Sequence, residues 1–268
     1  MVAHENNADS NDFDSSTMPF VAPCRKIGVL TPFRWLRLGW GDFNRARRQS
    51  LTYGLAMVAI SYIVAITAYL MGSYMLLFVL LSGFFFLGPV LAMGLYSISC
   101  QLQEGRRPRL GYCLREGRRH MGNGLVLAFV LLIVFLIWAR AASMLHIFFP
   151  EQSSPGLDEL KLFLGVGTSV GAFFSGIIFM VGAFSIPMIM DRKVDVITAV
   201  VTSVNAVFRN KAAMLVWMSI IVVCVIIGFA SAFVGLAVLL PLVGHATWYA
   251  YKETIDAEAW PRYESLKP

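Results

Sequence analysis

Charged side chains are scarce in this sequence. Asp, Glu, Lys and Arg make up 14% of the 268 residues, and 57% are hydrophobic, whereas a soluble domain ordinarily carries about 25% charged residues. Three stretches contain no charged residue: 50–103, 162–190 and 212–251. Roughly 20 consecutive apolar residues span a bilayer as a helix, and these runs lack the alternation of a membrane barrel. The composition predicts an all-α polytopic membrane helical bundle.

Motifs that carry chemistry are also missing. The four cysteines form no CxxC pair, and a disulfide framework is not expected. The sequence has no Walker motif, HExxH motif, zinc-ligand spacing or dinucleotide fingerprint. Its histidines, His4, His120, His146 and His245, are predicted at different depths or on opposite sides of the membrane, which does not suit a haem held by two axial ligands. We therefore expect no cofactor, no metal, no catalytic residue and no enzymatic activity.

The uncharged runs divide into six predicted membrane helices. A Gly-Ser turn, a charged loop and a weak break at Gly228–Ser231 separate the two members of each pair. The predicted spans are residues 51–71, 74–99, 122–148, 162–190, 212–229 and 233–251. They form a membrane domain over residues 25–252, between a disordered acidic tail at 1–24 and a C-terminal tail at 253–268.

The distribution of positive charge predicts the topology. Twenty of the 22 Lys and Arg residues lie in the four segments that six crossings place on one side. Cytoplasmic loops carry the excess of Lys and Arg in membrane proteins, so we expect both termini in the cytoplasm. The net charge of +6 then indicates contact with anionic lipid headgroups rather than nucleic acid. A membrane-protein partner or a second copy of the chain is left open.

The chain shows a threefold pattern. Amphipathic segments at 32–48, 109–120 and 194–210 each precede two predicted spans, and a proline lies near the cytoplasmic half of the second span: Pro89, Pro187 and Pro241. We interpret this as three repeats of an interfacial helix and a helical hairpin. The alternative is that the prolines are ordinary kinks in membrane helices.

A few residues within this frame are candidates for a functional or structural role. Arg140 is the single charge within a predicted span, and it either reaches the outer interface or handles a substrate. His245 is expected to form hydrogen bonds between helices, and Asp42 and Asp191 are polar positions in the basic segments. Gly167 and Gly171 form GxxxG, which favours close packing and makes the fourth span the best candidate for the bundle centre.

Several segments resemble a known family in order and wording. These are residues 35–43 (WLRLGWGDF), 50–54 (SLTYG), 185–195 and 241–251 (PLVGHATWYAY). Over about residues 25–255 the chain is similar to a proteobacterial family of predicted integral membrane proteins of unknown function. This resemblance implies a multi-pass protein of the bacterial inner membrane. Some members are labelled putative cytochrome c oxidase subunit I, but such a subunit ligates two haems and a copper with six histidines, and this chain has four.

The sequence therefore predicts a non-enzymatic structural, accessory or assembly factor of the inner membrane. The alternative is a small transporter that uses Arg140 and the glycine-rich fourth span.

Overall fold

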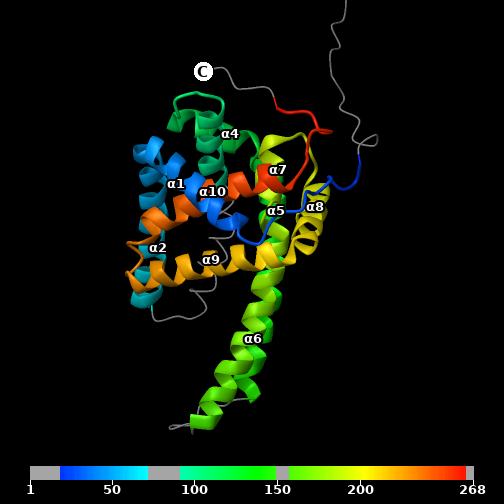
Figure 1. The fold of residues 1–268 in the computed structure, drawn as a ribbon. Helices are drawn as coiled ribbons and strands as arrows, with labels where there is room; N and C mark the ends of the chain where they lie inside the picture. The colour runs from blue at the N-terminus through cyan, green and yellow to red at the C-terminus, as the bar shows by residue number, and fades with distance from the viewer. Residues whose placement is uncertain (1–18, 72–90, 149–156, 264–268) are drawn as a thin grey trace, which may run out of the picture.

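The computed structural model describes residues 19–71, 91–148 and 157–263 (Figure 1). These parts contain helices and two isolated β-bridges, Cys24 with Ile255 and Arg192 with Arg262. Residues 91–103 are helical and are called the 91–103 helix. The labelled helices are α1 (Thr31–Arg45), α2 (Arg47–Met71), α4 (Leu110–Arg119), α5 (Met121–Phe148), α6 (Leu157–Gly182), α7 (Ser185–Asp191), α8 (Val196–Arg209), α9 (Lys211–Ala230) and α10 (Leu236–Thr254). The all-helical fold predicted from composition is confirmed for these residues.

Among the described residues, four helical segments are long and apolar enough to cross a membrane: Arg47–Thr67, Met121–Met144, Lys161–Asp191 and Lys211–Ala230. They correspond to the first, third, fourth and fifth predicted spans. Most of the second, with Pro89, lies outside the described residues, and α10 is not among the four. Six crossings therefore stay a prediction.

The predicted span 162–190 is not one continuous helix. It ends as α6 at Gly182, and a short turn through Ala183 and Phe184 leads into α7. Pro187 lies in the first turn of α7, where a proline removes no needed backbone donor. Pro187 therefore begins a new helix, whereas Pro241 lies inside α10 and is buried.

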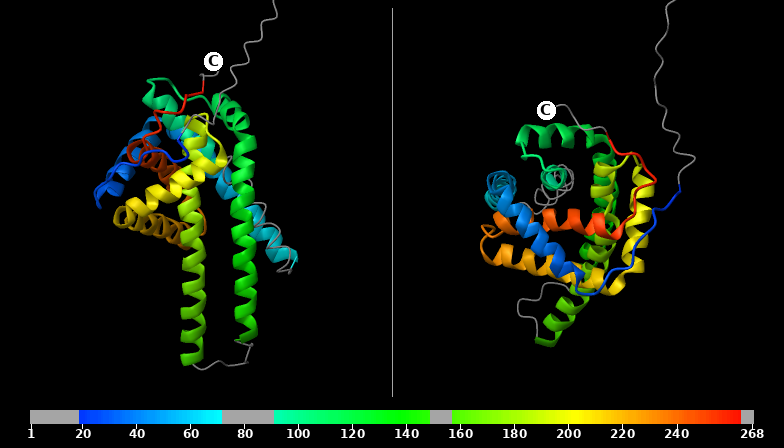
Figure 2. Two further views of the ribbon diagram at one scale, coloured as in Figure 1. Left: turned by 90° about the vertical axis from the view of Figure 1, so that its right-hand side faces the viewer. Right: turned by 45° about the horizontal axis from the view of Figure 1, so that its top comes forward.

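The bundle centre is α10 rather than the predicted fourth span. α10 packs against α1, α2, α9 and α7, whereas α6 packs mainly against α5 and α8. Figures 1 and 2 show α5 and α6 as a long pair that extends away from the other helices, while α9 and α10 run across its direction. The expectation that the glycine-rich helix lies at the centre is wrong, because glycines permit close approach but do not select the neighbour.

Close helix approach does occur, but at other glycines. A Cβ on Gly39 of α1 would lie 2.8 Å from the backbone nitrogen of Ala246, and one on Gly54 of α2 would collide with the carbonyl of Ala237. A Cβ on Gly167 or Gly171 would meet no described atom within 4 Å. The helices that touch backbone to backbone are therefore α1 and α2 against α10.

A short helix, a one-residue break and a long helix follow one another three times. Ala46 separates α1 from α2, His120 separates α4 from α5, and Asn210 separates α8 from α9. Each break residue leaves helical geometry, with ψ of 39°, 5° and 39°. This order of elements agrees with the interfacial helix and first span of the proposed repeat, and the repeat itself stays a prediction.

Candidate functional site

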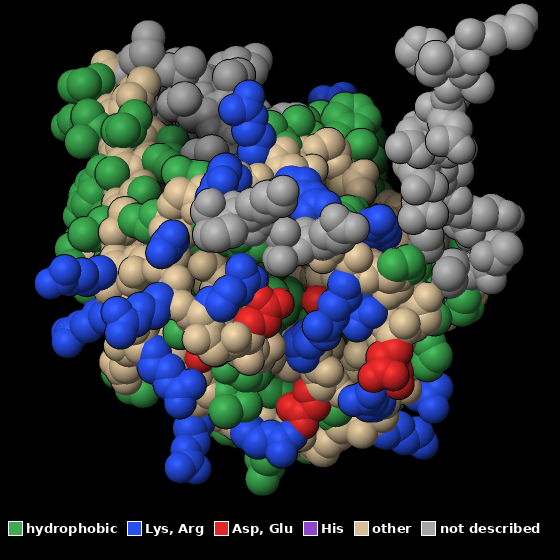
Figure 3. Space-filling model, turned by 90° about the horizontal axis from the view of Figure 1, so that it is seen from above, with side chains coloured by type: hydrophobic (Ala, Val, Ile, Leu, Met, Phe, Trp, Pro, Cys, Tyr) green, Lys and Arg blue, Asp and Glu red, His purple; other side chains and the backbone are tan. Residues whose placement is uncertain are grey.

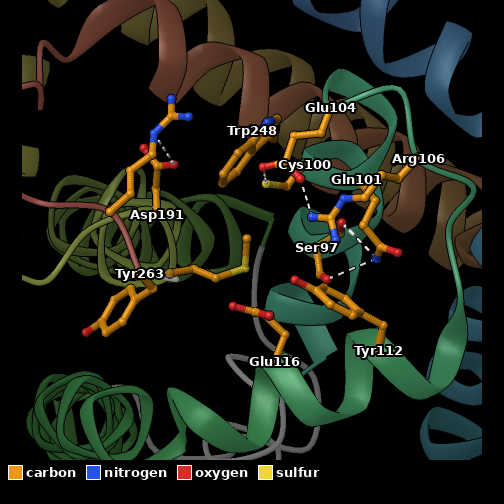
Figure 4. Close-up of a pocket in the computed structure, with 12 residues that line it drawn as sticks. Ser97, Cys100, Gln101, Glu104, Arg106, Tyr112, Glu116, Asp191, Trp248 and Tyr263 are labelled. Carbon is orange, nitrogen blue, oxygen red and sulfur yellow. Dashed lines mark hydrogen bonds and ion pairs between the residues drawn. The ribbon is translucent and has the colours of Figure 1, made fainter. Parts of the chain in front are cut away.

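Lys and Arg side chains gather on the face of the molecule seen in Figure 3, with a few acidic residues among them. A small polar cavity of about 60 Å³ lies among these charges. Figure 4 shows its side chains converging from several helices and from the segment after α10. It is lined by Ser97, Cys100, Gln101, Glu104, Arg106, Tyr112, Glu116, Met190, Asp191, Trp248, Arg262 and Tyr263.

Asp191 is the main ionic centre of this cavity and is 9% exposed. Its Oδ2 accepts hydrogen bonds from the Tyr251 hydroxyl at 2.8 Å, the Lys252 Nζ at 3.1 Å and the Arg192 Nε at 3.1 Å. The Nε of Arg262 lies 3.9 Å from Oδ1. One carboxylate thus joins the end of α7, the end of α10 and the C-terminal segment.

The C-terminal segment is tied to the rest of the protein mostly through its backbone. The Arg192 guanidinium donates to the Trp260 carbonyl at 2.7 Å, and the Lys193 amide donates to the Pro261 carbonyl at 2.9 Å. The Asp256 amide of the same segment donates at 2.8 Å to the carbonyl of Pro23, which lies near the other end of the chain. Part of the predicted C-terminal tail is therefore a packed element.

Glu116 of α4 lies on the opposite side of the cavity and points into it (Figure 4). Its Oε1 lies 3.3 Å from His120 Nε2, while its buried Oε2 has no hydrogen-bond partner in the described structure. Nearby, Glu104 pairs with Arg106, whose guanidinium also lies over the Tyr112 ring. Burial raises the pKa of the Cys100 thiol to about 12, so this cysteine is a poor nucleophile at neutral pH.

His245 occupies a second, fully buried polar centre. Its Nδ1 lies 2.8 Å from the Ser99 Oγ and its Nε2 lies 2.9 Å from the Ser50 Oγ, and all three residues are 0% exposed. The ring therefore joins α10 to the 91–103 helix and to α2. The prediction that His245 forms hydrogen bonds between helices is in agreement with this geometry.

Asp42 lies beside this network at 1% exposure. Burial raises the pKa of its carboxyl, although the Ser99 and Tyr249 hydroxyls and the charge of Arg45 oppose the change. Its Oδ2 has no hydrogen-bond partner among the described residues. The carboxyl lies close to Ser99, which also contacts His245, so Asp42 and His245 belong to one buried polar cluster.

Arg140 lies apart from both centres, as an exposed residue near the far end of α5. A cavity of about 200 Å³ does lie between α5 and α6, lined by Phe135, Trp138, Gly171, Phe174, Ser175 and Ile178. Gly171 therefore faces this cavity, whereas Arg140 is not among its lining residues.

Sequence reasoning missed Ser50, Ser99 and Glu116. The two serines lie at the ends of predicted spans, in a stretch without charged residues. Nothing else in the local sequence indicates that they contact a polar partner. Glu116 is the one acidic residue of the arginine-rich segment 106–119, which was a usable signal. No group of three His, Cys, Asp or Glu side chains in the described parts is arranged to hold a metal ion.

Comparison with known proteins agrees with the membrane class. Residues 76–191 match the model of a family described as "Predicted integral membrane protein (DUF2189)". That segment includes α4 to α7, and with them Glu116, Arg140 and Asp191. No curated protein and no solved structure matches the chain. With this similarity and four apolar helices of spanning length, the chain is an integral membrane protein.

Proposed function

We propose that the protein is a non-enzymatic structural, accessory or assembly factor of a membrane complex. One observation carries the proposal: two of the polar residues that the sequence singled out, Asp191 and His245, join helices to one another. Asp191 connects α7, α10 and the C-terminal segment, and His245 connects α10, α2 and the 91–103 helix. Polar side chains that are bonded to other helices in this way stabilise the helix bundle, which we call the framework.

The α5–α6 pair is the part of this framework best placed to contact a partner. It extends away from the other helices (Figure 2), and much of its apolar surface is exposed, including Val126, Phe129 and Phe173. In a membrane these residues face lipid or another protein. We propose a bacterial inner-membrane location with both termini in the cytoplasm, supported by the Lys and Arg residues on the face seen in Figure 3.

The test is gentle extraction of the tagged full-length chain from its native membranes, followed by native mass spectrometry. We expect a membrane protein to be recovered with the chain at a fixed stoichiometry. We also expect the complex of that protein not to assemble when this chain is deleted. A photo-crosslinking residue at Phe129 should trap that partner, and one at Ile226, an exposed position of α9, serves as the control. A chain that is recovered alone, with membrane complexes unchanged by its deletion, would contradict the proposal.

The topology is tested separately. Cys113 is only 1% exposed and is a poor target for a thiol reagent, so an introduced cysteine at the exposed Arg115 is the better probe. We expect R115C in intact cells to resist a membrane-impermeant maleimide and to react after lysis. Labelling of intact cells would reverse the proposed orientation.

The cavity between α5 and α6 favours a second candidate, a small transporter that uses Arg140 and the glycine-rich helix. If solutes pass through this cavity, G171F should block swelling of proteoliposomes in a panel of small solutes. G167F should not, because Gly167 does not line the cavity. Arg140 does not line it either, so R140A reduces swelling only if the solute also contacts Arg140 outside the cavity. Equal swelling in all three variants and the wild type would exclude this path.

A further inference from the structure

A larger cavity of about 340 Å³ lies next to the polar cavity, where the 91–103 helix turns into α4. Four of the six residues that line it are arginines. They come from the connecting loop and from the second turn of α4. The lining residues are Gln101, Arg106, Arg107, Arg109, Tyr112 and Arg115.

The positive charge in this cavity is not balanced. Glu104 pairs with Arg106, but Arg107, Arg109 and Arg115 are exposed and have no carboxylate partner within 4 Å in the described structure. Like charges held close together repel one another. An anion between them would remove that repulsion, and the planar guanidinium group binds phosphate through two parallel hydrogen bonds.

The loop that carries these arginines is held in place. The Arg106 amide donates to the Gln101 carbonyl at 2.8 Å, and the Arg109 amide donates to the Gln101 Oε1 at 3.2 Å. From α2, the Gln49 side chain donates to the Pro108 carbonyl at 3.0 Å. Gly105 makes the turn with a φ of +71°, which glycine adopts without strain. The backbone of the loop that carries the arginines is therefore preorganised, which reduces the entropy lost when an anion binds.

The start of α4 adds to the same field. Its N-cap is Arg109, no side chain caps its free amides, and its first turn contains no acidic residue. The N-terminus of a helix carries partial positive charge and unpaired amides, which together favour anions. Two lining residues, Arg109 and Tyr112, belong to this N-terminal turn.

The position of the cavity along the helices indicates its depth. Gln49 stands near the start of the candidate span Arg47–Thr67, and α4 ends just before the candidate span that starts at Met121. The cavity therefore lies beside the ends of two spans, at the level of lipid phosphates. The role of these arginines in setting the membrane topology requires only that they lie on the cytoplasmic side. It does not explain why four of them line one cavity on a fixed loop.

We propose that this cavity binds the phosphate group of an anionic ligand, either a lipid headgroup or a soluble phosphate. The proposal is independent of the accessory role, since a lipid-binding or phosphate-binding site serves any membrane protein that is held or regulated at this surface.

The test compares two triple variants of the full-length chain. In R107Q/R109Q/R115Q the unpaired cavity arginines are removed. In R37Q/R209Q/K211Q the same charge is removed from exposed positions outside the cavity. Binding is measured by native mass spectrometry and by the shift in unfolding temperature. One arm uses nanodiscs of phosphatidylglycerol or phosphatidylcholine, and the other uses inorganic phosphate and pyrophosphate in detergent.

We expect the wild type and the control triple to retain the anion, and the cavity triple to lose at least tenfold in apparent affinity. A response to phosphatidylglycerol alone identifies a lipid headgroup, and a response to pyrophosphate or phosphate in detergent identifies a soluble anion. The unfolding temperature without ligand checks that the cavity triple is folded. Equal loss in both triples, or no binding by the wild type in either arm, would overturn the proposal.

Discussion

The Nδ1 of His245 lies 2.8 Å from the Oγ of Ser99, in a place where neither residue is exposed to solvent. The other ring nitrogen lies 2.9 Å from the Oγ of Ser50. A neutral imidazole has one donor and one acceptor nitrogen, so the two serines satisfy the ring completely. A buried polar group without its partner costs far more than the bond contributes.

Replacing either serine should therefore destabilise the protein. We expect S50A and S99A each to lower the free energy of unfolding by about 1–3 kcal/mol, because one buried histidine nitrogen loses its partner. The measurement is thermal or denaturant unfolding in detergent. S219A is the control, since the Ser219 hydroxyl bonds only to the Leu215 carbonyl of its own helix. Losses no larger than that of S219A would show that the network does not stabilise the fold.

Asp191 should be the most sensitive carboxylate of the polar face. Breaking a buried ion pair leaves the partner charges uncompensated, and D191A should cost about 3–5 kcal/mol of unfolding free energy. D158A is the matched control. Asp158 also pairs with a lysine, Lys161, but its side chain is 97% exposed, and exposed pairs contribute little. An unfolding curve of D191A that overlays that of D158A would contradict the role given to Asp191.

We expect the buried carboxyl of Asp42 to make the stability of the fold depend on pH. Burial raises the pKa of its carboxyl above its ordinary value of 3.8, so the contribution of this carboxyl to stability is full below that value and is lost as the pH rises through the raised pKa. D42N removes this dependence and the unpaired charge. We expect D42N to be more stable than the wild type by about 1–2 kcal/mol at neutral pH, with the difference closing toward pH 4.

Asp195 gives the opposite case for comparison. Burial raises the pKa of its carboxyl, but hydrogen bonds from the Thr198 backbone and hydroxyl outweigh this, and the pKa is lowered. Its stabilising contribution is therefore present above the ordinary carboxyl pKa of 3.8 and is lost as the pH falls through the lowered pKa. D195A should cost about 1 kcal/mol at neutral pH as a lost helix cap. If D42N and D195A shift stability in the same direction with pH, the assignment for Asp42 is wrong.

The glycines of α2 and α6 should respond differently to alanine. A methyl group on Gly54 collides with the Ala237 carbonyl of α10, so G54A should cost about 1–3 kcal/mol through overpacking. At Gly167 and Gly171 a methyl group meets no described atom, so G167A and G171A should be neutral or gain up to about 1 kcal/mol from helix propensity. Unfolding temperatures in detergent decide between these outcomes. Destabilisation by G167A would instead indicate a contact of α6 with another chain.

Local features could be predicted from sequence where one stretch of chain decides them. The amphipathic segment predicted from residue 32 begins within one residue of the start of α1, and the weak Gly-Phe-Ala-Ser signal at 228–231 marked the end of α9. The turn that follows contains Ala232 and Phe233 at φ of 50° and 68°. These residue types rarely adopt that conformation, so the geometry of the turn could not be predicted from its residues.

Features that depend on partners far along the chain could not be predicted. Gly39 is a contact glycine because Ala246 faces it, about two hundred residues later, whereas a Cβ on Gly167 would meet no described atom within 4 Å. Asp191 could be identified from the sequence only as a polar position of a basic segment, because its bonds to Tyr251 and Lys252 depend on where α10 ends. Four arginines of one basic segment line a cavity because Gln49 of α2 and Gln101 hold the loop.

The central position of α10 has a consequence for biogenesis. This helix is synthesised after the other labelled helices, yet it is the main packing partner of α1 and α2, which are synthesised before them. The helices α1 and α2 must therefore wait, incompletely packed, until α10 has been made, because contacts of high sequence separation form late. A chain cut short before Leu236 would lose this partner entirely, and we expect membrane proteases to remove such truncated products.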